Sequence, residues 1–127
     1  MPKNVELIYW DYYSTEKENY DKKIKLNKEF SPNAWFAGGL WSWTGFAPHN
    51  VFSIKATEVA LKSCIENGVS DVLLTLWGDN GGECSRFALL PALFYASEIA
   101  KGNDESLIKQ KFEQKQVIVD KLWIKYG

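Results

Sequence analysis

The stretch from residue 75 to 83 (TLWGDNGGE) places an aromatic ring, two carboxylates and three glycines directly after an apolar run, residues 72–76. A buried strand that ends in polar and glycine residues is where α/β folds place ligands. The face of Trp77 is a flat apolar wall for the C–H face of a sugar ring, and Asp79 can accept hydrogen bonds from its hydroxyls. In the alternative reading, Trp77 is a core residue and Asp79 or Asn80 caps the next helix.

Two other predicted strands end in the same kinds of side chain. Residues 5–13 (VELIYWDYY) end in an aromatic and acidic group, and residues 34–43 (AWFAGGLWSW) end in two tryptophans. Because the carboxyl ends of parallel strands meet at one edge of a sheet, we expect these side chains to lie close together. The candidate substrate-binding residues are Trp10, Asp11, Tyr12, Trp41, Trp43, Trp77 and Asp79. Each ring taken alone could instead be a core residue.

Strand-like and helix-like segments alternate along the chain. The predicted strands cover residues 5–13, 34–43 and 70–77, and the predicted helices cover 15–30, 50–68 and 83–100, with a further helix after Asp104. The strands start roughly 30 to 35 residues apart, the size of a βα unit. This order predicts an α/β fold with parallel strands and helices outside the sheet. The paired glycines at 38–39 indicate a bulge or a close backbone approach.

Local signals set the expected helix ends. Thr15 and Glu18 have the spacing of a capping box, and Asn50 and Asp104 are expected helix caps. Pro91 lies inside the third expected helix, where it predicts a kink. The side chains expected on buried helix faces are Tyr20, Ile24, Leu26, Ala60, Leu61, Cys64 and Ile65.

Charge and composition exclude several classes of partner. Fifteen basic residues nearly cancel sixteen acidic ones, and a net charge of -1 offers no footprint for nucleic acid or an anionic membrane. We therefore expect a neutral or small polar ligand. No apolar run approaches the ~20 residues of a membrane span and no export signal is visible, which predicts a cytoplasmic protein. Cys64, Cys84 and the single histidine, His49, lack metal-site spacing, so free thiols are expected and neither metal nor cofactor is predicted.

Three motifs together resemble a known family. The runs YWDYY (9–13), WFAGGLWSWTGFAPHN (35–50) and VLLTLWGDNGGECS (72–85) resemble the last strands and loops of the family 20 glycoside hydrolases, the N-acetyl-β-hexosaminidases. The resemblance covers about residues 5–100. It implies that residues 1–102 are the last three βα units of a (β/α)8 TIM barrel and that residues 103–127 begin a helical C-terminal region.

The resemblance also implies an activity. Members remove terminal β-linked N-acetylglucosamine or N-acetylgalactosamine from glycans, with retention of configuration. The acetamido oxygen of the sugar attacks its own anomeric carbon, while a glutamic acid protonates the leaving oxygen and the aspartate before it orients the acetamide. That Asp-Glu pair follows the fourth strand of the family barrel. No Asp-Glu pair follows a strand here, because Asp104-Glu105 lies at a predicted helix start, past the last predicted strand. The chain would supply sugar-binding residues, and we expect it to be inactive alone.

The resemblance also assigns sugar-binding positions of the family to individual residues of this chain. Trp77 matches the eighth-strand tryptophan that walls the acetamide pocket. Asp79 stands where many members have a glutamate that binds sugar hydroxyls. Trp10 matches an aromatic residue of the sixth strand.

The second strand departs from the family pattern. Members usually have Tyr-x-Asp there, with the tyrosine hydroxyl supporting the acetamide oxygen, but this chain has residues 41–43 (WSW). Tyr12 or Tyr9, with Asp11, is expected to supply those groups from the neighbouring strand. Glu83 is acidic and near the expected site, and we expect it to open the following helix as a favourable charge at its first turn.

Two alternatives come from other classes. One is a noncatalytic carbohydrate-binding α/β module, because the aromatic residues are present and the acid is absent. The other is a flavodoxin-like nucleotide-binding domain, which is disfavoured because neither GxGxxG nor GK[ST] occurs. Three βα units cannot close a barrel, so strands 5–13 and 70–77 are expected to have unpaired edges. The remainder of the barrel or a second copy would then be needed for stability.

Overall fold

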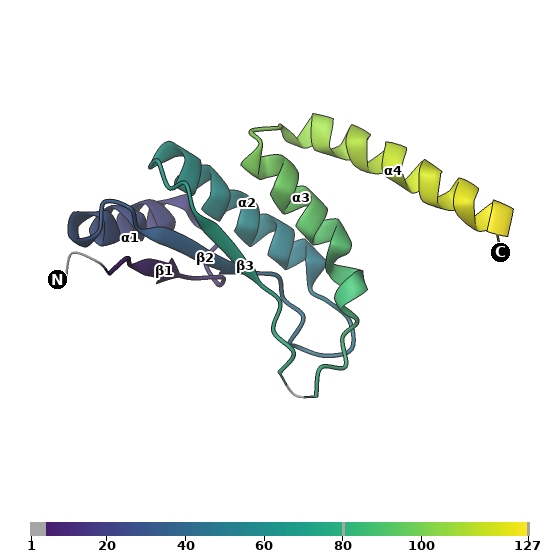
Figure 1. Ribbon diagram of the computed structural model, residues 1–127, viewed down its shortest axis with the longest axis horizontal. Coiled ribbons are helices and arrows are strands. Elements are labelled where there is room, and N and C mark those ends of the chain that lie inside the picture. The colour runs from purple at the N-terminus through teal and green to yellow at the C-terminus, as the bar shows by residue number, and fades with distance from the viewer. Residues whose placement is uncertain (1–4, 80, 127) are drawn as a thin grey trace.

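The computed structural model describes residues 5–79 and 81–126, with side chains described up to residue 115. Strands and helices alternate along the chain (Figure 1). The elements are β1 (Ile8–Trp10), α1 (Lys17–Phe30), β2 (Trp35–Gly39), α2 (Asn50–Glu66), β3 (Val72–Thr75), the 3-10 helix η1 (Arg86–Leu89), α3 (Leu90–Ala100) and α4 (Glu105–Tyr126). The predicted order of βα units, with an extra helix at the end, is confirmed.

The three strands form one parallel sheet in the order β1-β2-β3. In the register, Tyr9 pairs with Phe36, which pairs with Val72 on the other side. The fold is therefore α/β with a small parallel sheet, as predicted. The strands are shorter than expected, because the chain turns at Asp11 after β1 and the loops after Gly39 and Thr75 leave the ladder.

One face of the sheet carries the core. Tyr9 and Phe36 pack against Tyr20 from α1 and against Ala60 and Cys64 from α2. A second cluster on this side of the sheet joins α2, α3, α4 and β3. It consists of Leu61, Ala96, Ile99 and Ile108, with Val72 and Leu74 packed against it. In strands, alternate residues point to opposite faces, so all these contacts lie on the same side of the sheet. The helices α1, α2 and α3 therefore cover a single face.

The opposite face of the sheet is open. Ile8 and Trp10 of β1 and Leu73 of β3 alternate with the core residues, and they are 49%, 53% and 43% exposed. Parallel sheets normally have both faces covered. The outer strands β1 and β3 also each have one edge without a partner strand among the described residues. The expected unpaired edges are present, and one apolar face of the sheet is uncovered as well.

The first helix is capped differently from the prediction. α1 begins at Lys17, after Glu16, and no side chain caps its first turn. Ser14 Oγ accepts hydrogen bonds from the Glu16 N–H and from Asn19 Nδ2, both at 3.2 Å. The predicted capping box of Thr15 and Glu18 is wrong, because the turn that Asp11 and Ser14 hold together delays the helix start.

Of the predictions for the remaining helix ends, one is confirmed and two are wrong. Asn50 is the first residue of α2 rather than its cap, and its Nδ2 donates to the Ala88 carbonyl at 2.9 Å. Pro91 lies in the first turn of α3, where the missing N–H costs nothing, so the predicted kink is wrong. The N-cap role of Asp104 is confirmed, because its Oδ1 accepts the Leu107 N–H at 2.9 Å.

Two residues expected on buried helix faces are exposed. Leu26 of α1 and Ile65 of α2 lie outside the core, whereas the other expected residues are buried: Tyr20, Ile24, Ala60, Leu61 and Cys64. Apolar periodicity alone does not distinguish the side of a helix that meets the sheet from a flank beside it. Burial raises the pKa of the Cys64 thiol to about 12, which leaves it protonated at neutral pH.

Polar contacts fasten the helices to one another. Asp21 of α1 accepts hydrogen bonds from Ser63 Oγ and from Asn67 Nδ2 at the end of α2. The buried Glu98 of α3 forms ion pairs with Lys101 and with Lys111 of α4. Among residues 5–79 and 81–126, no helix has the length and apolar composition required to cross a membrane.

Candidate functional site

Six aromatic rings from the carboxyl ends of the three strands meet in one cluster. This aromatic cluster consists of Trp10, Tyr12, Tyr13, Trp41, Trp43 and Trp77. Tyr12 is central, with ring centroids 5.0 Å from Trp43, 4.8 Å from Tyr13 and 6.2 Å from Trp10. The five aromatic residues predicted as site residues are therefore all brought together.

Gly39, the last residue of β2, is the floor beneath these rings. A Cβ at this position would lie 3.0 Å from Tyr12 Cδ1 and 3.1 Å from both Trp43 Cη2 and Thr75 Oγ1. These distances are tighter than ordinary contacts, so a side chain would displace the rings. The paired glycines form no bulge, since the register of β2 with β3 is continuous, and the close approach at Gly39 is made by side chains instead of the predicted backbone.

Hydrogen bonds from the loop after β2 hold both neighbouring loops. Trp41 Nε1 donates to the Tyr12 carbonyl at 2.9 Å, and Ser42 Oγ donates to the Trp77 carbonyl at 2.6 Å. The Trp41 N–H also donates to Ser53 Oγ of α2 at 2.8 Å. Since Ser42 is buried, its bond to the Trp77 carbonyl is protected from water. The three loops are thereby fixed relative to one another.

Trp10 and Trp77 stack across the open face of the sheet. Their ring centroids are 5.7 Å apart with an interplanar angle of 15°. Trp10 is the last residue of β1 and Trp77 lies in the loop after β3, and the small residue Ala37 of β2 is in register with Trp10. Both rings stay partly exposed. The pair thus presents the outer faces of two indoles to solvent at the carboxyl edge.

The two predicted carboxylates differ in what they contact. Asp11 accepts hydrogen bonds from the Tyr9 hydroxyl at 2.8 Å and from the Tyr13 N–H at 2.9 Å, which folds the turn after β1. Asp79 is exposed, and its charge contributes to the raised pKa of Tyr12. Of the two, Asp79 has the freer side chain beside the aromatic cluster.

The structure places Tyr9 and Tyr12, the two tyrosines that the sequence offered as supports for the acetamide oxygen, in different surroundings. Tyr9 lies in the core on the helix side of the sheet, and burial raises its pKa. Tyr12 lies in the aromatic cluster, where burial first, then Tyr13 and Asp79, raise its pKa. Tyr12 therefore stays protonated at neutral pH, and its hydroxyl can donate a hydrogen bond to a ligand.

The glycine-rich loop after Trp77 needs its glycines. Gly81 and Gly82 have φ angles of +96° and +68°, which side chains disfavour, and the Gly82 N–H donates to the Asp79 carbonyl at 3.3 Å. Glu83 lies in this loop before η1, so its predicted place at a helix start is wrong. Asn80 lies outside the described residues.

Three contributors were not singled out from the sequence. Tyr13 packs edge-on against Trp41 at 5.3 Å, and Phe52 of α2 packs against the other side of the site at 4.8 Å from Trp41. Ser42 joins two loops, as described above. The position of Ser42 between two site tryptophans was a usable signal, whereas the contact of Phe52 depends on how α2 approaches the loop.

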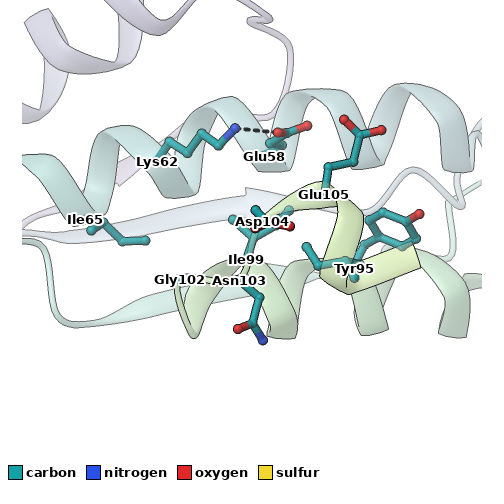
Figure 2. Close-up of a pocket in the computed structure, with 10 residues that line it drawn as sticks. Glu58, Lys62, Ile65, Tyr95, Ile99, Gly102, Asn103, Asp104 and Glu105 are labelled. Atoms are coloured by element: carbon teal, nitrogen blue, oxygen red, sulfur yellow. Dashed lines mark hydrogen bonds and ion pairs between the residues drawn. The ribbon is translucent and has the colours of Figure 1, made fainter. Parts of the chain in front are cut away.

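A separate cavity of about 270 Å³ lies between α2, α3 and the start of α4 (Figure 2). Ile65, Ile99 and Ile108 are among the residues that line it. Glu58 and Lys62 form an ion pair at its rim, and Asp104 and Glu105 also line it. The junction of α3 and α4 is at the opposite end of the molecule from the loops that follow β2 and β3 (Figure 1). The Asp104-Glu105 pair is thus remote from the aromatic cluster.

No protein-family model matches the chain, and no match is found among curated proteins.

Proposed function

We propose that this chain binds the terminal N-acetylhexosamine of a glycan, as the last three βα units of an N-acetyl-β-hexosaminidase TIM barrel. The observation that carries the proposal is the convergence of six aromatic side chains from three successive strand ends. The resemblance of residues 9–13, 35–50 and 72–85 to family 20 glycoside hydrolases supports the choice of sugar.

The chemistry of the cluster suits a neutral, ring-shaped, polar ligand. The exposed indole faces of Trp10 and Trp77 offer apolar surface to the C–H face of a pyranose. Tyr12 offers a hydroxyl donor for the acetamide oxygen, and Asp79 offers acceptors for sugar hydroxyls. A site with few polar groups among aromatic walls fixes the orientation of a small ligand.

In this proposal the residues described here hold the sugar and do not cleave it. The acetamide oxygen of the substrate is the nucleophile, so the protein must orient the acetamide and protonate the leaving oxygen. The acid comes from an earlier strand of a longer parent. Asp104 caps α4 at the remote end of the molecule, which argues against its pair with Glu105 as the catalytic pair. A cytoplasmic location stays a prediction that cell fractionation would test.

The decisive experiment measures binding of a thiazoline mimic of the oxazolinium intermediate, followed by tryptophan fluorescence. Binding should be lost in Trp77→Ala and weakened in Asp79→Ala. Trp35→Ala, which removes a tryptophan outside the aromatic cluster, should leave it unchanged. An N-terminally extended parent should also cleave a chromogenic N-acetyl-β-hexosaminide. An extended protein that is inactive, with neither form binding the thiazoline, would exclude a hexosaminidase.

The second candidate is a noncatalytic carbohydrate-binding module. It is favoured by the Trp10–Trp77 stack, which forms without any contribution from further strands. This candidate predicts sugar binding by the 127-residue chain alone, at the same affinity as by the extended protein. Affinity that appears only after N-terminal extension would exclude it.

A further inference from the structure

The cavity between α2, α3 and the start of α4 combines apolar and charged lining residues (Figure 2). Ile99 and Ile108 are buried, whereas Ile65 is 52% exposed and leaves apolar surface open to the cavity. The volume of about 270 Å³ lies just below the range of small-molecule sites, about 300–1,000 Å³. The cavity therefore has room for a ligand with a single ring or a short alkyl chain.

The direction of α4 creates this space. The turn from α3 to α4 contains Gly102, whose φ of +79° is a left-handed conformation, and a Cβ there would meet no described atom within 4 Å. Ile108 and Phe112 of α4 then pack against α3, where Phe112 contacts Phe94 and Tyr95. Beyond its first turns α4 runs away from α2 (Figure 1). The gap between α2 and α4 is therefore a product of the fold.

Carboxylates outnumber ammonium groups among the lining residues. Glu58, Asp104 and Glu105 are acidic, and Lys62 is basic. Lys62 pairs with Glu58 at 2.6 Å, and Lys109, which is not a lining residue, pairs with Glu105 at 2.7 Å. Each lysine compensates one carboxylate, so the charge of Asp104 is left over. The local potential therefore favours a cation over an anion.

Glu105 is the carboxylate that can most easily accept a new partner. Its side chain and that of Lys109 are 65% and 60% exposed. An ion pair between exposed side chains contributes little to stability, because water screens it and both side chains lose freedom. Lys109, and to a smaller extent Lys62, lower the pKa of Glu105, which keeps it ionised at neutral pH. A ligand ammonium group held in the cavity can therefore replace Lys109 at this carboxylate.

The helix ends around the cavity are compatible with a cation. α2 and α3 end there, and the carbonyl end of a helix carries partial negative charge. α4 begins there, but Asp104 and Glu105 offset the partial positive charge of its first turn. Two lysines approach these ends: Lys101 after α3 pairs with Glu98, and Lys28 of α1 bonds carbonyls just beyond α2. The helix ends thus add no barrier to a positive ligand group.

We propose that this cavity binds a small organic ammonium ion, with its apolar body against Ile65 and Ile99 and its ammonium group beside Glu105. Tyr95 also lines the cavity, and the face of an aromatic ring attracts a cation. A ligand without an apolar body would leave the isoleucines in contact with water, and an anion would meet the surplus carboxylate. The site is remote from the aromatic cluster, and the proposal is independent of the sugar.

Proton–nitrogen correlation NMR of the 127-residue chain tests the site, with benzylammonium as the probe. The amide signals of Ile65, Gly102 and Ile108 should shift and saturate, whereas that of Gly45, in the loop after β2, should not move. Benzyl alcohol should bind roughly tenfold more weakly, because it lacks the charge-assisted contact. Benzoate should shift no signal at the cavity. Equal affinities for the three probes, or no shifts at the cavity, would overturn the proposal.

Matched variants locate the probe. Ile65→Trp should fill the cavity and abolish binding, whereas Leu26→Trp adds the same ring at an exposed position of α1 and should bind like the wild type. Glu105→Gln should weaken benzylammonium roughly tenfold and leave benzyl alcohol unchanged. Glu113→Gln, on the exposed side of α4, is the control for charge. Circular dichroism establishes that each variant is folded. If folded Ile65→Trp binds the probe as the wild type does, the ligand occupies another place and the assignment is wrong.

Discussion

The two faces of the sheet are made by alternate residues of the same strands, yet their surroundings are opposite. Phe36 on the helix side is 1% exposed, whereas Leu73 on the neighbouring strand is 43% exposed on the open side. Both faces are nevertheless apolar. The difference teaches that apolar composition predicts which surfaces need cover, while the topology decides which of them this chain covers by itself.

Phe36→Ala should have the largest effect, because it empties the centre of the covered face. Removing a fully buried Phe typically costs about 3–5 kcal/mol of the free energy of unfolding. Guanidinium unfolding would measure it. Leu73→Ala on the open face is the matched control and should cost well under half as much at low protein concentration. Equal losses at low concentration would show that the two faces are buried alike.

Gly39→Val should disturb both the fold and the site. The added side chain meets Tyr12, Trp43 and Thr75 at 3.0 to 3.1 Å, and overpacking of this kind costs about 1–3 kcal/mol. Thermal unfolding would report the loss of stability, and near-ultraviolet circular dichroism would report displaced rings. Gly78→Ala is the control, because a Cβ there meets ordinary contacts of 3.7 Å and beyond. An unchanged aromatic spectrum in Gly39→Val would contradict the close approach.

Trp10→Ala should lower the free energy of unfolding less than Phe36→Ala does, and its main effect should be on sugar binding. The lost ring stacking is worth about 0.5–1.5 kcal/mol. The variant should also show a smaller exciton signal in circular dichroism, because the Trp10–Trp77 coupling is lost while Trp41 and Trp43 stay 5.0 Å apart, and it should lose sugar binding. Trp35→Ala should keep the exciton signal. A stability loss for Trp10→Ala as large as that for Phe36→Ala would mean that the open face contributes to the fold as strongly as the covered one.

The smallest effect concerns pH and the outer layer on the covered side. The ion pairs with Lys101 and Lys111 lower the pKa of Glu98 from 4.5 to about 2. Because the folded pKa is depressed, the contribution of Glu98 is complete above pH 4.5 and is lost as the pH falls toward 2. Unfolding measured between these pH values should have a shallower slope in Glu98→Gln. An unchanged slope would show that a group other than Glu98 titrates over this pH range. Glu113→Gln, on the exposed side of α4, is the control.

The sequence predicted the architecture better than its details. Alternating apolar strands and helix signals predicted the βα order and the common edge of Trp10, Trp41 and Trp77, because parallel strands leave their carboxyl ends together. The capping box predicted at Thr15 is absent because hydrogen bonds to Asp11 and Ser14 order the turn before α1, and the helix begins only at Lys17. The prediction that Leu26 is buried is wrong because helical periodicity identifies one side of α1 but not which element packs against that side.

The site was predictable as a collection of residue types but not as a set of contacts. Nothing in the spacing of Trp10 and Trp77 indicates that their rings stack, because that depends on the small residues of β2 between them. The choice of Tyr12 over Tyr9 also required the structure, because Tyr12 lies after β1 in the turn that Asp11 forms. The identity of the sugar stays a prediction from the resemblance.

The hydrogen bonds from Trp41 to the Tyr12 carbonyl and from Ser42 to the Trp77 carbonyl have a consequence for protein engineering. The two contacts make the loop after β2 the hub of the carboxyl edge. Transplanting one loop from another protein would remove a donor or an acceptor that the other loops need. New ligand specificity should therefore be sought by exchanging all three loops as one cassette, or by changing side chains that take no part in these bonds, such as Asp79.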